Sequence, residues 1–153
     1  MNDSGEEPTK IKILVLDEQP LLRHGIRAYL NSQPDMMVCS EAGTISDARS
    51  KISDCQPEFL VTALRLGAED GLKFVKKLRR EVPRLRILVY SEFAETIFAE
   101  RAIRAGANGY VMKQAPPENL TTAIRDIAKS GIYVSRELAL SALRKSLGAA
   151  TEK

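Results

Sequence analysis

Short runs of apolar residues alternate with longer amphipathic stretches along most of this chain, and this alternation restricts the fold more than any other feature. The first run, Ile11 to Leu16, is nearly all apolar, which is typical of a strand buried on both faces. Four shorter runs follow, namely Val38 to Glu41, Phe59 to Thr62, Ile87 to Tyr90 and Tyr110 to Met112. Because helical patterns separate these runs, the sequence predicts an α/β fold with a doubly wound parallel sheet.

The same patterns divide the chain into three parts. Residues 1–10 predict a flexible acidic tail, residues 11–130 the doubly wound domain, and residues 131–153 a C-terminal helix and the start of a linker. In the last part, Ser135 is the expected N-cap and Gly148 the expected stop of a helix that ends at Leu147. The polar N-terminus predicts no signal peptide, and no apolar run approaches the ~20 residues of a membrane span. We therefore expect a cytoplasmic protein without membrane contact.

Composition argues against several classes of protein. The net charge of +3 is too small to indicate nucleic-acid binding by itself. Basic residues crowd between Lys73 and Arg86, which predicts a solvated face or, alternatively, a patch for nucleic acid or an acidic partner. Cys39 and Cys55 are too few for a disulfide framework or a zinc site, so reduced and partly buried thiols are expected. The lone histidine, His24, is expected at a solvated helix position.

Polar side chains follow several of the predicted strands, at the edge where a doubly wound sheet carries its functional site. Asp17 and Glu18 follow the first strand, Ser91 the fourth and Lys113 the fifth. Adjacent carboxylates repel each other unless a cation lies between them, and either Mg²⁺ or Lys113 would serve. The alternative is that both acids are solvated and cap the next helix. An acid pair here argues against a flavin or nucleotide phosphate site.

Four segments together resemble a known family, the receiver domain of bacterial two-component response regulators, and most closely its NarL/FixJ (LuxR-type) subgroup. The segments are Arg104 to Lys113, Val15 to Pro20, Asp70 to Leu72 and Gly131 to Ser135. The resemblance covers about residues 11–139. It implies a flavodoxin-like (βα)5 fold with strand order 2-1-3-4-5 and a C-terminal helix. It also implies a signalling module in a phosphorelay, not an enzyme.

The resemblance assigns roles to the residues at the strand ends. Asp17 and Glu18 would hold Mg²⁺, Ser91 and Tyr110 would be the switch residues, and Lys113 would contact phosphoryl oxygens. The implied partners are a second copy in a homodimer and a sensor kinase or other signalling protein. In the subgroup a helix-turn-helix domain binds DNA, and that domain is absent from this chain.

One position departs from the family pattern. The family's third strand ends in the aspartate that takes the phosphoryl group, and the matching residue here is Ala63. A methyl group has no lone pair and cannot attack phosphorus. The sequence therefore predicts a pseudo-receiver that regulates by protein contact, with weak or vestigial Mg²⁺ binding at Asp17 and Glu18. Unusual neighbours such as Arg65 and Gly67 favour natural divergence over an engineered substitution.

Several alternatives stay open at this point. A relocated acceptor, such as Asp70 or one of the first-strand acids, would make the chain a working phosphorelay receiver. The chain is otherwise the receiver part of a DNA-binding transcription regulator whose helix-turn-helix domain lies outside it. A small nucleotide- or flavin-binding enzyme would use the same fold. A nucleic-acid-binding protein would use the basic region after Lys73.

Overall fold

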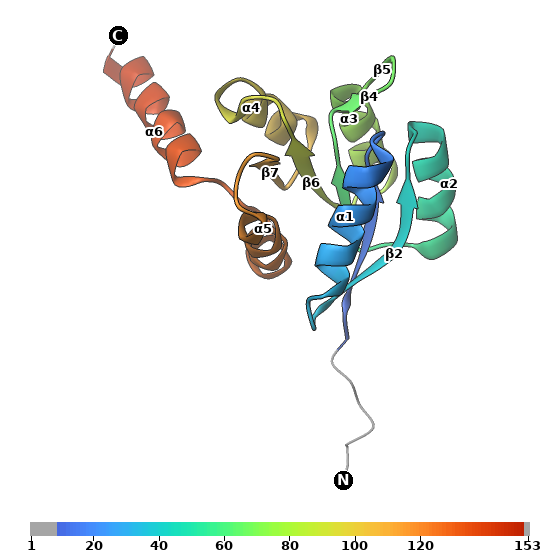
Figure 1. Cartoon of the computed structure of the whole chain (residues 1–153). Coiled ribbons are helices and arrows are strands. Elements are labelled where there is room, and N and C mark those ends of the chain that lie inside the picture. The colour runs from blue at the N-terminus through green and yellow to red at the C-terminus, as the bar shows by residue number, and fades with distance from the viewer. Residues whose placement is uncertain (1–8, 152–153) are drawn as a thin grey trace.

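Five parallel strands form the central sheet of the computed structural model, which describes residues 9–151 and the side chains as far as residue 148 (Figure 1). The strands lie in the order β2-β1-β3-β6-β7, and every neighbouring pair is parallel. Their bounds are β1 (Ile11–Leu16), β2 (Met36–Ala42), β3 (Phe59–Thr62), β6 (Arg86–Ser91) and β7 (Gly109–Met112). The predicted doubly wound, flavodoxin-like order is confirmed.

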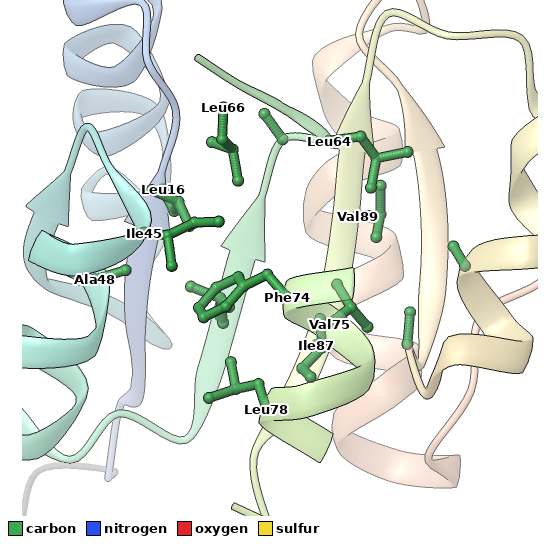
Figure 2. Close-up of a cluster of buried hydrophobic side chains, with 14 of the residues drawn as sticks. Leu16, Ile45, Ala48, Leu64, Leu66, Phe74, Val75, Leu78, Ile87 and Val89 are labelled. Atoms are coloured by element: carbon green, nitrogen blue, oxygen red, sulfur yellow. The ribbon is translucent and has the colours of Figure 1, made fainter. Parts of the chain in front are cut away.

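Helices cover both faces of this sheet. They are α1 (Pro20–Asn31), α2 (Ile45–Cys55), α3 (Gly71–Glu81), α4 (Glu95–Ala105) and α5 (Pro117–Ser130), followed by α6 (Arg136–Thr151). The core has two halves, because successive strand side chains point to opposite faces. Leu14 and Leu16 of β1 join α2, α3 and α4, whereas Ile13 and Val15 join α1 and α5. Figure 2 shows the first half, with Phe74 packed into it from α3.

Two helices begin with a side-chain N-cap, and the one at Ser135 was predicted. Thr44 Oγ1 accepts a hydrogen bond from Asp47 N at 3.1 Å, as an N-cap should. Ser135 Oγ likewise accepts from Leu138 N at 3.1 Å at the start of α6. The predicted stop at Gly148 is wrong, because α6 continues to Thr151. A glycine costs an exposed helix only about 1 kcal/mol, and the two alanines after it are strong helix formers.

A small hairpin between β3 and α3 was not predicted. It pairs β4 (Arg65–Leu66) with β5 (Glu69–Asp70) in antiparallel fashion. Gly67 begins its turn with a φ of +66°, which glycine adopts at no steric cost. Leu64 and Leu66 are buried in the core, and Figure 2 shows Leu66 beside Leu16 and Ile45. These two leucines therefore anchor the hairpin in the core at the carboxyl end of the sheet.

The strand β2 lies at the edge of the sheet, as predicted, and its pairing with β1 is irregular. Ile13 pairs with Val38 and Leu14 pairs with Ser40, so Cys39 has no partner on β1. One unpaired residue in a strand of this kind is a β-bulge. At the opposite edge, Gly109 of β7 forms an isolated parallel bridge with Tyr133.

The predicted division of the chain stays a prediction, although α5 ends at Ser130, where the doubly wound domain is expected to end. Most of the predicted acidic tail, residues 1–8, lies outside the described residues, as does the end of the predicted linker, residues 152–153. Between residues 9 and 151, no helix combines the length and apolar character that crossing a bilayer requires.

Candidate functional site

Asp17 and Lys113 meet at the carboxyl edge of the sheet in an ion pair that is almost removed from water. Lys113 Nζ lies 2.7 Å from Asp17 Oδ2, and the two side chains are 11% and 3% exposed. Asp17 Oδ1 accepts a second hydrogen bond from Gln19 N at 2.9 Å. Asp17 follows β1 and Lys113 follows β7, so the sheet brings together residues 96 positions apart. The sequence argument predicted this convergence, and both oxygens of Asp17 have partners.

Glu18 turns to a different partner. Its Oε1 accepts a hydrogen bond from Gly67 N at 2.8 Å, in the turn of the unpredicted hairpin. The two adjacent acids are therefore separated, with Asp17 paired to Lys113 and Glu18 tied to a backbone amide. The repulsion expected between them is relieved by these two donors and does not require a metal ion.

Ala63 stands directly after β3, at the position that the resemblance assigns to the acceptor. Its N–H donates to Leu16 O at 3.0 Å, and the residue is 4% exposed. The hydroxyl of Thr62 donates to Ala63 O at 2.8 Å. Asp70, the suggested relocated acceptor, caps α3 by accepting hydrogen bonds from Leu72 N and Lys73 N at 2.9 and 3.4 Å. No nucleophilic side chain therefore stands at position 63 itself.

Ser91 and Tyr110 are both tied to the backbone of Phe93, in the connection between β6 and α4. Phe93 N donates to Ser91 Oγ at 3.0 Å, and Tyr110 Oη donates to Phe93 O at 2.7 Å. Both side chains are buried. Burial raises the pKa of Tyr110 by more than its contact with Ser91 lowers it, so the phenol keeps its proton. These bonds hold the two residues in one arrangement.

Glu92 was missed by the sequence argument, although it directly follows Ser91 at the end of β6. Its Oε1 lies 3.6 Å from Lys113 Nζ, and its Oε2 lies 3.4 Å from Arg65 Nη2. The Arg65 guanidinium also stacks over the Phe93 ring, 5.5 Å from its centroid. A row of alternating charges thus runs from Asp17 through Lys113 and Glu92 to the hairpin. The sequence signal for Glu92 was its position directly after Ser91, a predicted site residue.

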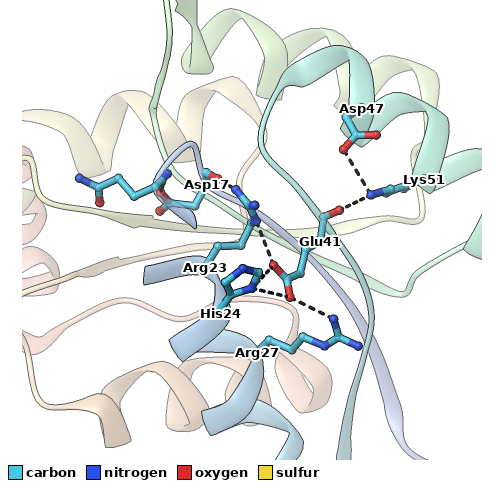
Figure 3. A network of polar contacts seen from close by, with 8 residues as sticks. Asp17, Arg23, His24, Arg27, Glu41, Asp47 and Lys51 are labelled. Atoms are coloured by element: carbon cyan, nitrogen blue, oxygen red, sulfur yellow. Dashed lines mark hydrogen bonds and ion pairs between the residues drawn. The ribbon is translucent and has the colours of Figure 1, made fainter. Parts of the chain in front are cut away.

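A second polar network holds the loop that carries Asp17 (Figure 3). Arg23 of α1 bonds Glu41 Oε1 through Nε at 2.9 Å and Asp17 O through Nη1 at 2.7 Å. Arg27 and His24 also contact Glu41, at 3.1 and 3.0 Å. Burial raises the pKa of Glu41, but hydrogen bonds from Arg27, Arg23 and His24 outweigh it and hold that pKa below its ordinary value. Glu41 is therefore ionised at neutral pH and fixes the β1–α1 connection.

The residues present do not fit a ready Mg²⁺ site. Mg²⁺ needs free carboxylate oxygens in near-octahedral geometry, whereas both oxygens of Asp17 and one of Glu18 already accept hydrogen bonds. Among residues 9–151, no group of three or more His, Cys, Asp or Glu side chains lies close enough to hold a metal ion. A metal ion here would compete with the Lys113 ammonium for the Asp17 carboxylate.

We therefore expect weak Mg²⁺ binding. In a chemical-shift titration, the Gln19 and Gly67 amides, which bond the two carboxylates, should not move in a saturable way at sub-millimolar Mg²⁺. Sodium chloride at matched ionic strength is the control for non-specific screening. A saturable shift of both amides at sub-millimolar Mg²⁺, absent with sodium chloride, would contradict this expectation.

The predicted basic region forms part of α3 and the segment after it. Lys73, Lys76, Lys77 and Arg80 line a shallow hollow together with Glu81. These four cations are exposed, and Glu81 pairs with Arg49 of α2 at 2.6 Å. This arrangement is that of a solvated charged face, and nucleic-acid binding through it stays untested.

Comparison with known proteins gives one family. The family model described as the response regulator receiver domain matches residues 13–125. The chain is 32% identical over 120 residues to an uncharacterized transcriptional regulatory protein, YxjL of Bacillus subtilis (strain 168), covering 78% of this chain and 55% of that protein. It is 33% identical over 132 residues to the oxygen regulatory protein NreC of Staphylococcus aureus (strain JH9), covering 86% and 61%. The chain thus spans less than two thirds of the length of these relatives.

Solved structures agree with this assignment. A two-component response regulator of the LuxR family from Aurantimonas sp. SI85-9A1 superposes with a TM-score of 0.81 at 27% identity, over 91% of this chain and 99% of that one. The signal receiver domain of a response regulator named NarL from Mycobacterium tuberculosis gives a TM-score of 0.74 at 26% identity, over 80% and 99%.

Proposed function

Because this chain belongs to the response regulator receiver domain family, we propose that it is a pseudo-receiver, which signals without phosphorylation at the usual site. NarL-type receivers are signalling proteins and not typical enzymes. The observation that carries the proposal is Ala63, the buried residue that directly follows β3. By the resemblance this position holds the aspartate that accepts the phosphoryl group. A methyl group there removes the nucleophile.

The contacts of the remaining site residues support the same proposal. By the resemblance, Lys113 would contact a phosphoryl group, and here it is paired with Asp17 at 2.7 Å and lies 3.6 Å from Glu92, so both carboxylates would compete with that group for the ammonium. The proposed switch residues, Ser91 and Tyr110, already bond the Phe93 backbone. In this proposal, contacts within the protein hold the site residues in place of a phosphoryl group. The module therefore rests in one conformation.

We also propose that the module acts by contact with other proteins, as a homodimer and with a sensor kinase or other signalling protein. Leu21 of α1 is 86% exposed and Ile97 of α4 is 56% exposed, and in this proposal such side chains are the first candidates for the contact surfaces. A link to transcription regulation rests on the printed name of the Bacillus relative. DNA binding would then belong to the part of that relative which this chain does not span.

The test is intact mass after incubation with acetyl phosphate and Mg²⁺. We expect the unmodified chain to gain no phosphoryl group and an Ala63→Asp variant to gain one, because the variant restores a carboxylate at the end of β3. Sedimentation of the same samples reports the oligomeric state. An Asp70→Asn variant is the matched control for a relocated acceptor.

Phosphorylation of the unmodified chain would contradict the proposal, and loss of that signal in Asp70→Asn would identify the acceptor. If neither the unmodified chain nor Ala63→Asp gains a phosphoryl group, the proposal of a pseudo-receiver stands. In that case the hairpin, whose Gly67 amide holds Glu18, also prevents phosphorylation of the restored aspartate.

A further inference from the structure

Two cysteines from different elements face each other beside the edge strand. Cys39 lies in β2 and Cys55 is the last residue of α2. Their Sγ atoms are 2.7 Å apart, although the residues are 16 positions apart in the sequence. Both are free thiols and both are half-buried, so neither is sealed in the core. Neither residue takes part in the site at the carboxyl ends of the strands.

The backbone on each side explains why the sulfurs meet. Cys39 is the unpaired residue of the β-bulge, and a bulge changes the direction in which a strand side chain points. Gln56, which follows Cys55, has a left-handed φ of 46° and ends α2 abruptly. Lys12 Nζ donates to Cys55 O at 3.1 Å and holds this end of the helix against β1. Two irregular backbone positions therefore place the thiols together.

We propose that Cys39 and Cys55 form an oxidation site, in which a small-molecule disulfide such as oxidised glutathione converts the two thiols into an intramolecular disulfide. The present separation exceeds the covalent S–S distance of about 2.05 Å by only roughly 0.7 Å. Closing such a gap requires side-chain rotation and little movement of the backbone. The site is independent of phosphorylation and adds a chemical input that the proposed function does not include.

The chemistry is two successive thiol–disulfide exchanges. Burial raises the pKa of Cys39 to about 12, and its hydrogen bond with Cys55 adds to this effect. Cys39 is therefore the poorer nucleophile, and we assign the first attack to Cys55. It forms a mixed disulfide and releases one glutathione thiolate. Cys39 then loses its proton to solvent, attacks the Cys55 sulfur and releases the second glutathione. The protein loses two hydrogens and two electrons, and oxidised glutathione becomes two reduced glutathiones.

The bond would fasten the C-terminal end of α2 to the edge strand. The N-terminal end of α2 is already held by the Thr44 cap, and its middle is held by Lys51, whose Nζ donates to Glu41 O of β2 at 2.6 Å. A disulfide stabilises mainly by restricting the unfolded chain, and its effect grows with the length of the closed loop. Oxidation would therefore raise the melting temperature and protect the amides of α2 from exchange.

The experiment treats the reduced chain with oxidised glutathione, blocks remaining thiols with iodoacetamide and maps peptides without reduction. We expect the two free thiols to disappear, a peptide linked through Cys39 and Cys55 to appear, and Tm to rise by about 5–10 °C. Dithiothreitol should reverse all three changes. A Cys39→Ser variant should stop at the mixed disulfide on Cys55, and a Cys55→Ser variant should react slowly, because its one thiol is Cys39.

Three results would overturn the proposal. They are two free thiols after prolonged oxidation, a stable glutathione adduct on the unmodified chain without a linked peptide, and a linkage between two chains on a non-reducing gel. If Cys39→Ser fails to fold, Cys39→Ala is the second variant, since it leaves no hydroxyl in the half-buried position. The linked peptide is read from the unmodified chain and does not depend on either variant.

Discussion

Replacing Lys113 with methionine lowers the free energy of unfolding by about 3–5 kcal/mol, because it leaves a buried carboxylate without its cation. The Asp17 side chain is 3% exposed, so water cannot take the place of the lost ammonium group. Asp17 would keep one hydrogen bond, from Gln19 N. Methionine fills most of the volume of the lysine stem. The loss of unfolding free energy therefore measures removal of the charge and not formation of a cavity.

Urea unfolding of three variants beside the unmodified chain checks this result. The double variant Asp17→Asn with Lys113→Met removes both charges and should recover most of the loss. Arg104→Met, which breaks the exposed pair between Arg104 and Glu100, should cost less than about 1 kcal/mol. If Lys113→Met also costs less than about 1 kcal/mol, the ion pair with Asp17 is solvated and the site is not held as described.

Replacing Gly71 with alanine costs about 2–3 kcal/mol, although alanine favours helices and Gly71 is the first residue of α3. A Cβ at this position would lie 2.4 Å from Leu64 O and 2.7 Å from Leu64 Cα. Both are backbone atoms of the segment that leads into the hairpin, and the Gly71 amide itself donates to Leu64 O at 3.2 Å. The contact closes the base of the hairpin, so the extra methyl group would push the hairpin from the sheet.

Gly25→Ala is the matched control, because a Cβ built on Gly25, in the exposed face of α1, meets no atom within 4 Å apart from its chain neighbours and the backbone of its own helix. This substitution should stabilise the protein by about 0.5–1 kcal/mol through the unfolded state. Thermal melting of both variants gives the comparison. Opposite signs are expected, and a stabilising Gly71→Ala would mean that the hairpin does not pack against the start of α3.

The sheet and its helices were predictable because their signals are local. Most strands of the central sheet carry a short apolar run, and the helices that cover it carry an apolar stripe with a period near 3.6 residues. The order of the strands came from the resemblance to the receiver family. The placement of Asp17 and Lys113 at one edge of the sheet followed from parallel topology, since parallel strands end at the same edge. Their roles in signalling stay predictions.

Three other features could not be predicted from local sequence patterns. The hairpin strands have two residues each, too short for any periodicity, and what holds them is burial of Leu64 and Leu66. The partner of Glu18 is a backbone amide, which no pattern of side chains in the sequence predicts. The bulge at Cys39 depends on how β2 fits β1. Each of these is a tertiary contact between segments, so it becomes visible only after the chain has folded.

The bulge also affects how the protein behaves at high concentration. An exposed sheet edge offers unpaired N–H and C=O groups to a strand of another molecule, which is a route to aggregation. At Cys39 the bulge interrupts the regular spacing of those groups on β2. At the other edge, the bridge from Gly109 to Tyr133 occupies part of β7. Neither edge presents a long flat row of unpaired groups, so the sheet is protected against pairing with a strand of another molecule.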